Sequence, residues 1–357
     1  MQSKRTTIGL ATTGVVAGVV GIALIAAPAS AGPAPSLPSV TPTALVSSVL
    51  TAKTPAFSGT ISADNELGLP ALPSMPQLAN GTSRYQLYSD GHGRARLSIP
   101  RRDSALTLVE DGNAVYSYNS GTRAATKTEL PRHGKAHRAL GKQTSADPGK
   151  LADELIGVLK QHSVVSVRGT GTVAGRSAYE LVLQPKPSEK TLLRQVRIAV
   201  DAKTRMPLQV EVFGNGSSGP ALQVGFSSLS TAAPDAALFH FTPPAGVKVT
   251  DTSKQQSARA NHMSTLATHE PKVVGSGWDT VIVASLPAGQ SAPAPGDAHH
   301  GQGTAAMIQR LGTPVSGSWG SGRLVSIKLG SAIITSDGRV AAGAVPAQVL
   351  EAALAAK

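Results

Sequence analysis

The order of apolar and polar positions divides the chain into short helical segments and long runs of alternating residues. Thr41 followed by Pro42 marks the start of a helix, and apolar residues four positions apart continue it to about Lys53. From Phe57 to Pro131 the period changes to two, which is typical of strands. Turn dipeptides separate the runs at Asn80-Gly81, Asp90-Gly91 and Asp111-Gly112. This pattern predicts one helix followed by an antiparallel meander.

A second helix and more strands follow. Asp147 and Pro148 start the helix, and its apolar stripe is predicted at Leu151, Leu155, Ile156 and Leu159. Alternating runs resume at Val164, with a hairpin turn at 174–176, and continue to Phe226. Residues 251–262 are polar and unpatterned, which indicates a linker. A smaller unit of strands and helices is predicted at 263–357, with one short helix at about 305–311 and another starting at Pro346.

The N-terminus has the three parts of a secretory signal. Lys4 and Arg5 precede an uncharged run from Ile8 to Ala27, and the small residues of Ala29-Ser30-Ala31 form a cleavage site. An uncleaved membrane anchor is the alternative, because about 20 apolar residues span a bilayer. The prediction is a signal peptide at 1–31 and a mature protein in the extracellular or cell-wall space.

Composition excludes several classes of protein. Among 357 residues there is no cysteine, so a disulfide scaffold, thiolate catalysis and cysteine-ligated metal are ruled out. Aromatic residues make up only 3%, so the core must be built from aliphatic side chains. The 33 Lys and Arg against 21 Asp and Glu give a net charge of +12.

A search for catalytic or metal-binding patterns finds none. There is no G-x-S-x-G elbow. The glycines at 169, 171 and 175 lack the spacing and the following helix of a dinucleotide loop. His133 and His137 have metal-ligand spacing but lie among cations, which oppose a metal ion. We therefore expect no enzyme activity, no cofactor and no metal.

A basic stretch at 123–142 carries six Lys or Arg residues and one acid, Glu129. Nucleic acid is disfavoured as its partner, because no aromatic residues for base stacking are interleaved and the protein is expected to be exported. An anionic membrane surface, a protein partner and a solvated loop stay open as interpretations. The candidate contact residues are Arg132, Lys135, Arg138 and Lys142.

Several phrases together resemble the periplasmic lipoprotein-carrier (LolA-like) family over about residues 41–250. They are "LVEDGNAVYSYN", "AGRSAYELVLQP", "IAVDAKTRMPLQVEV" and the closing "FHFTPPAGVKV". The extra C-terminal unit, through "GSAIITSDGRVAAGAVPAQVLEAALAA", resembles the second domain of the two-domain relatives that regulate an envelope-stress anti-sigma factor (RseB/MucB-like).

The resemblance implies an α+β fold: an open, curved antiparallel half-barrel with helices on its concave face, and a small C-terminal α+β domain. It also implies an apolar cavity for the acyl chains of lipids or lipoproteins, in a carrier or envelope sensor. The alternative it implies is a regulator that binds the exterior part of an anti-sigma factor. From the residues alone, an ordinary packed core is equally compatible. The candidate cavity residues are Leu106, Leu108, Leu181, Leu183, Val196, Ile198, Val210 and Val212.

Overall fold

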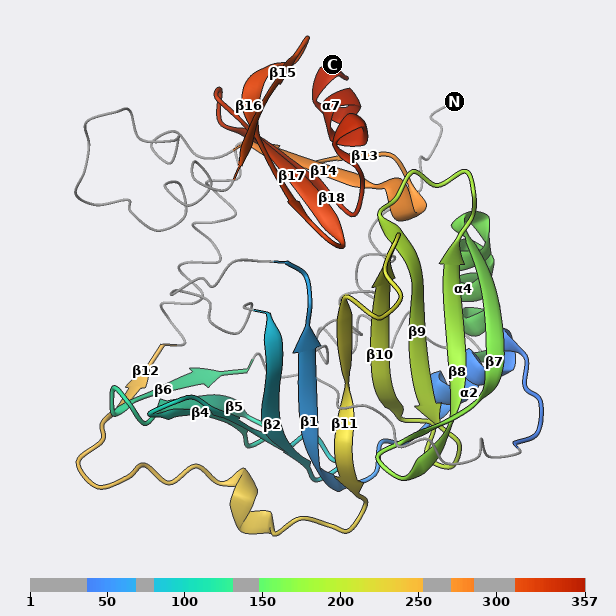
Figure 1. Ribbon diagram of the computed structural model, residues 1–357. Helices are drawn as coiled ribbons and strands as arrows, with labels where there is room; N and C mark the ends of the chain where they lie inside the picture. Colours follow the sequence, from blue (N-terminus) through green and yellow to red (C-terminus); the bar gives the residue numbers. More distant parts are fainter. Residues whose placement is uncertain (1–36, 69–79, 131–147, 253–270, 286–311, 357) are drawn as a thin grey trace, which may run out of the picture.

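The computed structural model describes residues 37–68, 80–130, 148–252, 271–285 and 312–356, which form two β-sheets with α-helices beside them (Figure 1). The first sheet has twelve strands in the order β12-β6-β5-β4-β3-β2-β1-β11-β10-β9-β8-β7. The second has six, in the order β13-β14-β18-β17-β16-β15.

The strands of the first sheet are β1 Phe57–Asn65, β2 Gly81–Ser89, β3 Ala95–Pro100, β4 Ala105–Glu110, β5 Ala114–Asn119, β6 Ala124–Glu129, β7 Ser163–Val173, β8 Arg176–Pro185, β9 Leu193–Asp201, β10 Pro207–Gly214, β11 Leu222–Ser230 and β12 Val249–Asp251. Those of the second are β13 Lys272–Val274, β14 Val281–Ser285, β15 Thr313–Gly317, β16 Gly320–Ile327, β17 Gly330–Thr335 and β18 Arg339–Gly343. The α-helices of the described residues are α2 Pro42–Thr51, α4 Pro148–His162 and α7 Ala347–Ala355, and the 3₁₀ turns are η2 Ala236–Phe239 and η3 Gly277–Asp279.

The first sheet is open and strongly curved. Its strand pairs are antiparallel except β12 with β6. β7 comes back into contact with β11, although β8, β9 and β10 lie between them in the sheet order. Helices α2 and α4 contact each other and lie against β7. The predicted fold class, an open half-barrel with helices on one face and a smaller second sheet, is confirmed.

Helix α2 starts as the sequence predicts, and α4 begins at the predicted Pro148, although its predicted cap Asp147 lies outside the described residues and its buried stripe differs. Thr41 caps α2, and its Oγ1 accepts the Ala44 N–H at 3.2 Å. In α4 the fully buried positions are Ala152 and Ile156, whereas Leu151 is 36% exposed. The predicted stripe was wrong at Leu151, because small Ala152 occupies the side of the helix that is buried.

The turns follow local chemistry. The hairpin between β7 and β8 turns on Ala174 and Gly175, both with positive φ. The carboxylate of Asp111 accepts the N–H groups of Asn113 and Ala114 at 2.8 Å. The closing phrase at 239–249 is without strand structure until Val249, where β12 begins. Its Phe239 is 1% exposed in η2, and its Phe241 stacks on the Tyr116 ring at 5.3 Å.

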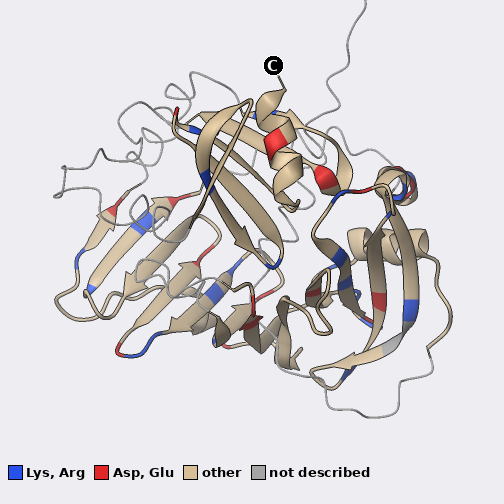
Figure 2. Cartoon of the chain, turned by 45° about the horizontal axis from the view of Figure 1, so that its top comes forward, with Lys and Arg blue, Asp and Glu red and all other residues tan. Residues whose placement is uncertain are grey.

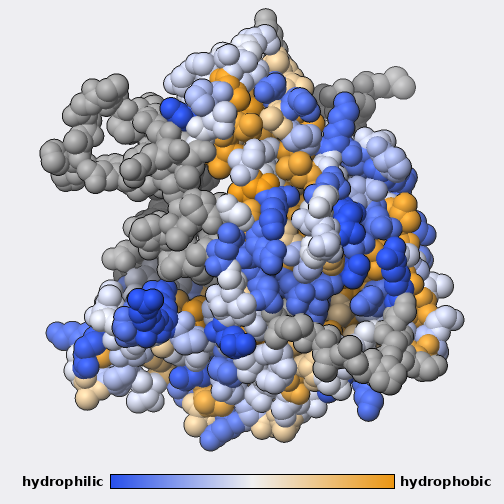
Figure 3. Space-filling model, in the orientation of Figure 1, coloured by the Kyte–Doolittle hydropathy of each residue, from blue (hydrophilic) through white to orange (hydrophobic). Residues whose placement is uncertain are grey.

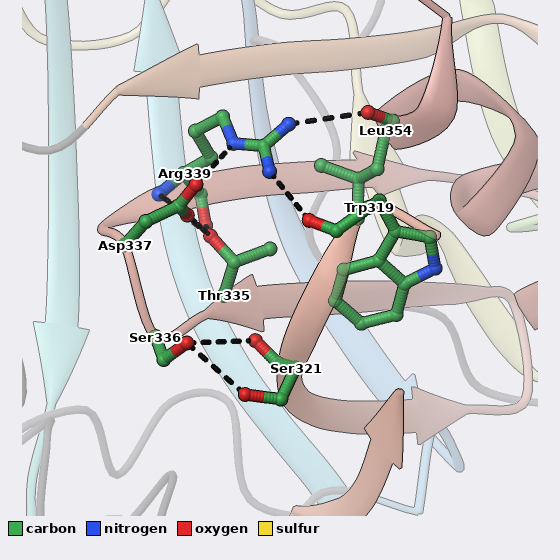
Figure 4. Close-up of polar contacts among 7 residues, drawn as sticks. All are labelled: Trp319, Ser321, Thr335, Ser336, Asp337, Arg339 and Leu354. Carbon is green, nitrogen blue, oxygen red and sulfur yellow. Dashed lines mark hydrogen bonds and ion pairs between the residues drawn. The ribbon is translucent and has the colours of Figure 1, made fainter. Parts of the chain in front are cut away.

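The second sheet has two strands that the pattern did not predict, β13 and β15, and the predicted helix at 305–311 lies outside the described residues. Helix α7 covers one face, where Leu350 and Leu354 join the core. Arg339 ties the unit together. It donates to the carbonyl oxygens of Trp319 at 2.8 Å and Leu354 at 3.1 Å and pairs with Asp337 (Figure 4).

None of the helices in the described ranges is both long and apolar enough to span a bilayer. The predicted signal peptide at 1–31 lies outside those ranges, as do most residues of the predicted linker.

Candidate ligand-binding face

Strand pairing places the predicted cavity residues on one face of the first sheet, because residues paired across strands point to the same side. Leu181 pairs with Ile198, Ile198 with Val210, and Val210 with Val224. The next row, two residues along, is Leu183, Val196, Val212 and Leu222.

The other half of the sheet continues this face. Val224 pairs with Ala63 of β1, and Gly59, on the same side of β1, pairs with Leu87. Leu87 pairs with Leu97, and Leu97 with Leu108. Leu106 lies two residues from Leu108 on β4. All eight candidates therefore share what we call the inner face.

The helices cover only part of the inner face. Leu181 is 7% exposed and packs with Leu45 of α2, and Ile198 is packed against the same cluster. The remaining six candidates are half-buried: Leu106, Leu108, Leu183, Val196, Val210 and Val212. These six aliphatic side chains therefore keep part of their surface exposed.

The inner face is uncharged where the candidates lie. The rows that contain them hold only aliphatic, small or uncharged polar residues from β1 to β4 and from β8 to β11. The opposite, outer face carries charge in the row Val182, Arg197, Glu211, Gln223 and Asp64. Figure 2 shows charged residues spread over the strands and turns.

Charge on the outer face is locally compensated. Arg197 lies 3.8 Å from Glu211, and its guanidinium sits 4.5 Å from the centre of the Phe213 ring. Burial raises the pKa of Glu211, against the lowering effect of Arg197. In this row the charged side chains face outward, whereas the rows of the candidates on the inner face are aliphatic or uncharged, which suits a binder of hydrocarbon.

The four basic candidates, Arg132, Lys135, Arg138 and Lys142, lie outside the described residues. Two cations at the start of the basic stretch are within them and have partners. Arg123 donates to the Ala245 carbonyl at 2.9 Å. Lys127 pairs with Glu129 at 3.2 Å, and this hydrogen bond raises the pKa of Lys127.

A polar junction joins the two sheets, and no sequence pattern predicted it. The Trp278 Nε1–H donates to Ser163 Oγ at 2.7 Å, and its backbone N–H donates to Glu189 Oε2 at 2.9 Å. The other oxygen of Glu189 lies 2.7 Å from His162 Nδ1. The Glu189 side chain is only 7% exposed. These four residues, Trp278, Ser163, Glu189 and His162, are the junction.

Backbone contacts complete this interface. Thr191 Oγ1 and the Leu192 N–H both donate to the Ala344 carbonyl, at 2.6 and 2.8 Å. Gly277 has φ +69°, and a Cβ at this position would lie 2.3 Å from the His162 ring. Only glycine fits there. The second sheet is thus attached at the ends of the strands that carry Leu183 and Val196.

The described residues contain no group of three or more His, Cys, Asp or Glu side chains placed to hold a metal ion. The buried acids of the junction and of the turn at Asp201 each bind structural partners.

The structure is similar to solved structures of two groups of proteins. MucB in complex with MucA(peri) aligns over 87% of this chain and 94% of its own, with 15% identity and a TM-score of 0.38. The Pseudomonas aeruginosa MucA/MucB complex covers the same shares at 14% identity and a TM-score of 0.37. A LolA-superfamily protein of Nitrosomonas europaea covers 57% of this chain and 99% of its own, at 12% identity and a TM-score of 0.25. No protein-family model and no curated protein matches it.

We expect Glu189→Ala to loosen the second sheet from the first. The change removes the acceptor of two hydrogen bonds to a nearly buried carboxylate, each worth about 1.5–3 kcal/mol. Acrylamide quenching of the tryptophan fluorescence, to which Trp278 contributes, should increase, and thermal unfolding should separate into two transitions.

Glu66→Ala is the matched control at the same interface. Glu66 pairs with Lys328 at 3.2 Å, but its side chain is 68% exposed, so its loss should cost less than about 1 kcal/mol. Equal effects of the two changes would show that the junction does not hold the sheets together.

Proposed function

We propose that the chain is an exported, non-enzymatic protein that binds the acyl chains of a lipid or lipoprotein on the inner face, as a carrier or envelope sensor. The observation that carries the proposal is the half-buried, uncharged aliphatic surface that β4 and β8–β10 present on one side of a curved sheet. Burying an acyl chain there gains about 0.8 kcal/mol per methylene. The sequence resemblance to lipoprotein carriers supports the same role.

Export is part of the proposal and rests on the sequence at 1–31. The destination proposed is the extracellular or cell-wall space, with attachment through an uncleaved N-terminus as the alternative. The basic stretch at 123–142 is proposed as an edge that meets an anionic membrane or a protein partner, on its charge alone.

The test is native mass spectrometry of the protein purified from the cells that make it, followed by solvent extraction and identification of any lipid. We expect adducts with the mass of acyl lipids, and we expect the delipidated protein to take up a fluorescent hexadecanoic acid. Delipidated, folded protein that does not bind this probe would show that the inner face is not an acyl site.

A protein partner is the second candidate function, and the junction favours it. A second unit fixed beside the strand ends that carry Leu183 and Val196 could report on what the inner face holds. The proposed partner is the exterior part of an anti-sigma factor, which is the alternative that the sequence resemblance implies. A pull-down that yields one stoichiometric protein and no lipid would favour this candidate over the carrier.

A further inference from the structure

A half-buried arginine lies at one end of the inner face. Arg205 is in the turn between β9 and β10, and its guanidinium carbon Cζ sits 5.1 Å from the centre of the Tyr179 ring. Tyr179 pairs with Val200, two residues along from the pair of Leu181 with Ile198. Because side chains two residues apart on a strand share a side, Tyr179 belongs to the inner face. Arg205 therefore places a positive charge at the end of this face.

Arg205 lacks the polar partners that comparable arginines have. In the described ranges, four arginines lie over an aromatic ring. Arg94 and Arg197 each have a carboxylate within ion-pair distance, and Arg194 donates to a backbone carbonyl. The Nη1 of Arg205 is buried without a hydrogen-bond partner, and no acid of the described ranges forms an ion pair with this side chain.

The turn that carries Arg205 has no acid to spare for it. Asp201 is the only acidic residue of 201–207, and its carboxylate pairs with Arg176 and accepts the N–H groups of Lys203 and Thr204. Hydrophilic side chains gather over β9 and β10 on the side turned away from α2 and α4 (Figure 3), which is the opposite side of the sheet. A guanidinium nitrogen withdrawn from water without an acceptor is costly, so an anion from another molecule would stabilise it.

The backbone at Arg205 has a conformation that arginine rarely adopts. Its φ is +61°, in the left-handed region, where a Cβ crowds the backbone and glycine is favoured. Residues held in such conformations cluster at sites where a side chain has a function. Here the left-handed backbone accompanies a guanidinium laid over Tyr179 at the end of the inner face.

We propose that Arg205 binds the anionic head group, a carboxylate or a phosphate, of the acyl ligand whose chain lies on the inner face. The planar guanidinium presents a fork of N–H donors that matches both groups. From this turn β10 leads to the half-buried Val210, three residues or about 10 Å of strand beyond Pro207. An acyl chain laid along β10 can therefore have its head group at Arg205. This inference rests on the proposed function and gives the bound chain a direction.

The test compares two probes that differ in the charge of the head group: hexadecanoic acid labelled with a fluorophore at its methyl end, and the methyl ester of the same molecule. The delipidated full chain should bind the acid about 10- to 100-fold more tightly, the range expected for hydrogen bonds between charged groups. Arg205→Gln should lower the affinity for the acid to that for the ester and leave the affinity for the ester unchanged.

Two further variants separate charge from folding. Lys203→Gln is the matched control, because it removes one positive charge from the same turn at an exposed position, and it should keep the preference for the acid. Arg205→Gly suits the left-handed backbone, so it should fold as the wild type does by circular dichroism. It should lose the preference for the acid as Arg205→Gln does.

The outcomes distinguish this inference from the proposed function. Equal affinities of the wild type for acid and ester, or a preference for the acid that survives in Arg205→Gln, would overturn the head-group site and leave acyl binding intact. Binding of neither probe would overturn acyl binding itself. Inorganic phosphate separates the two sources of an anion. If phosphate raises the melting temperature of the wild type but not of Arg205→Gln, while acid and ester bind equally, Arg205 binds a free anion and the head-group assignment is wrong.

Discussion

Replacing Asp201 by Ala is expected to lower the free energy of unfolding by about 3–5 kcal/mol, because it removes the buried acceptor of several charge-assisted hydrogen bonds, each worth about 1.5–3 kcal/mol. Asp201, at the end of β9, is 1% exposed and forms an ion pair with Arg176 at the start of β8. It also accepts the N–H groups of Lys203 at 2.8 Å and Thr204 at 2.6 Å. One carboxylate thus joins the hairpin to the β9–β10 turn, and Ala would leave all of these donors unpaired.

The measurement is urea-induced unfolding of the full chain followed by circular dichroism. Asp337→Ala is the matched control, since Asp337 makes a similar pair with Arg339 but is 56% exposed. Its loss should cost about 1 kcal/mol or less. A cost for Asp201→Ala no larger than that of the control would show that burial does not strengthen the Arg176 pair.

The same residue makes stability depend on pH. Burial raises the pKa of Asp201, but the hydrogen bonds from Arg176, Thr204 and Lys203 outweigh it and hold the pKa below its ordinary value. A folded-state pKa below the unfolded one gives stability that is present above about pH 3.9 and is lost as the pH falls through the folded pKa. Asp201→Asn should therefore flatten the loss of stability on acidification.

The sequence predicted the elements that depend on interactions between residues a few positions apart. The cap at Thr41 and the carboxylate turn at Asp111 depend on neighbours within a few residues, and both are present. Alternation also predicted which residues share a side of a strand. The eight inner-face candidates lie together for that reason, although their pairing across strands could be known only from the structure.

Other features depend on contacts between distant residues. Trp278 donates a hydrogen bond to Ser163, which lies 115 residues earlier in the sequence. No periodic pattern of residues predicts such a contact. The only signal was the rarity of the residue, since Trp278 is one of two tryptophans. β15 was missed because Pro314 and the glycine at 317 depress strand propensity, whereas pairing with β16 overrides them. Contacts with α2 and the sheet decide which side of α4 is buried. As a result Ala152 is buried and Leu151 is exposed.

A bulky side chain added to the inner face distinguishes a ligand site from a packed core. Val210→Phe is expected to leave the unfolding free energy nearly unchanged, because Val210 is half-buried. The new ring should displace the equivalent of about two to three ligand methylenes. At about 0.8 kcal/mol each, affinity for a fluorescent hexadecanoic acid should fall roughly 10- to 50-fold.

Two further substitutions by Phe serve as controls for this result. Leu181→Phe lies under α2, where Leu181 is 7% exposed, and overfilling should destabilise the protein by about 1–3 kcal/mol. Gln209→Phe is on the outer face of the same strand as Val210, and it should leave acyl affinity unchanged. If Val210→Phe destabilises the chain as much as Leu181→Phe does, the inner face is filled by the protein itself. In that case its aliphatic rows serve stability, and the site of action has to be sought at the junction and the second sheet.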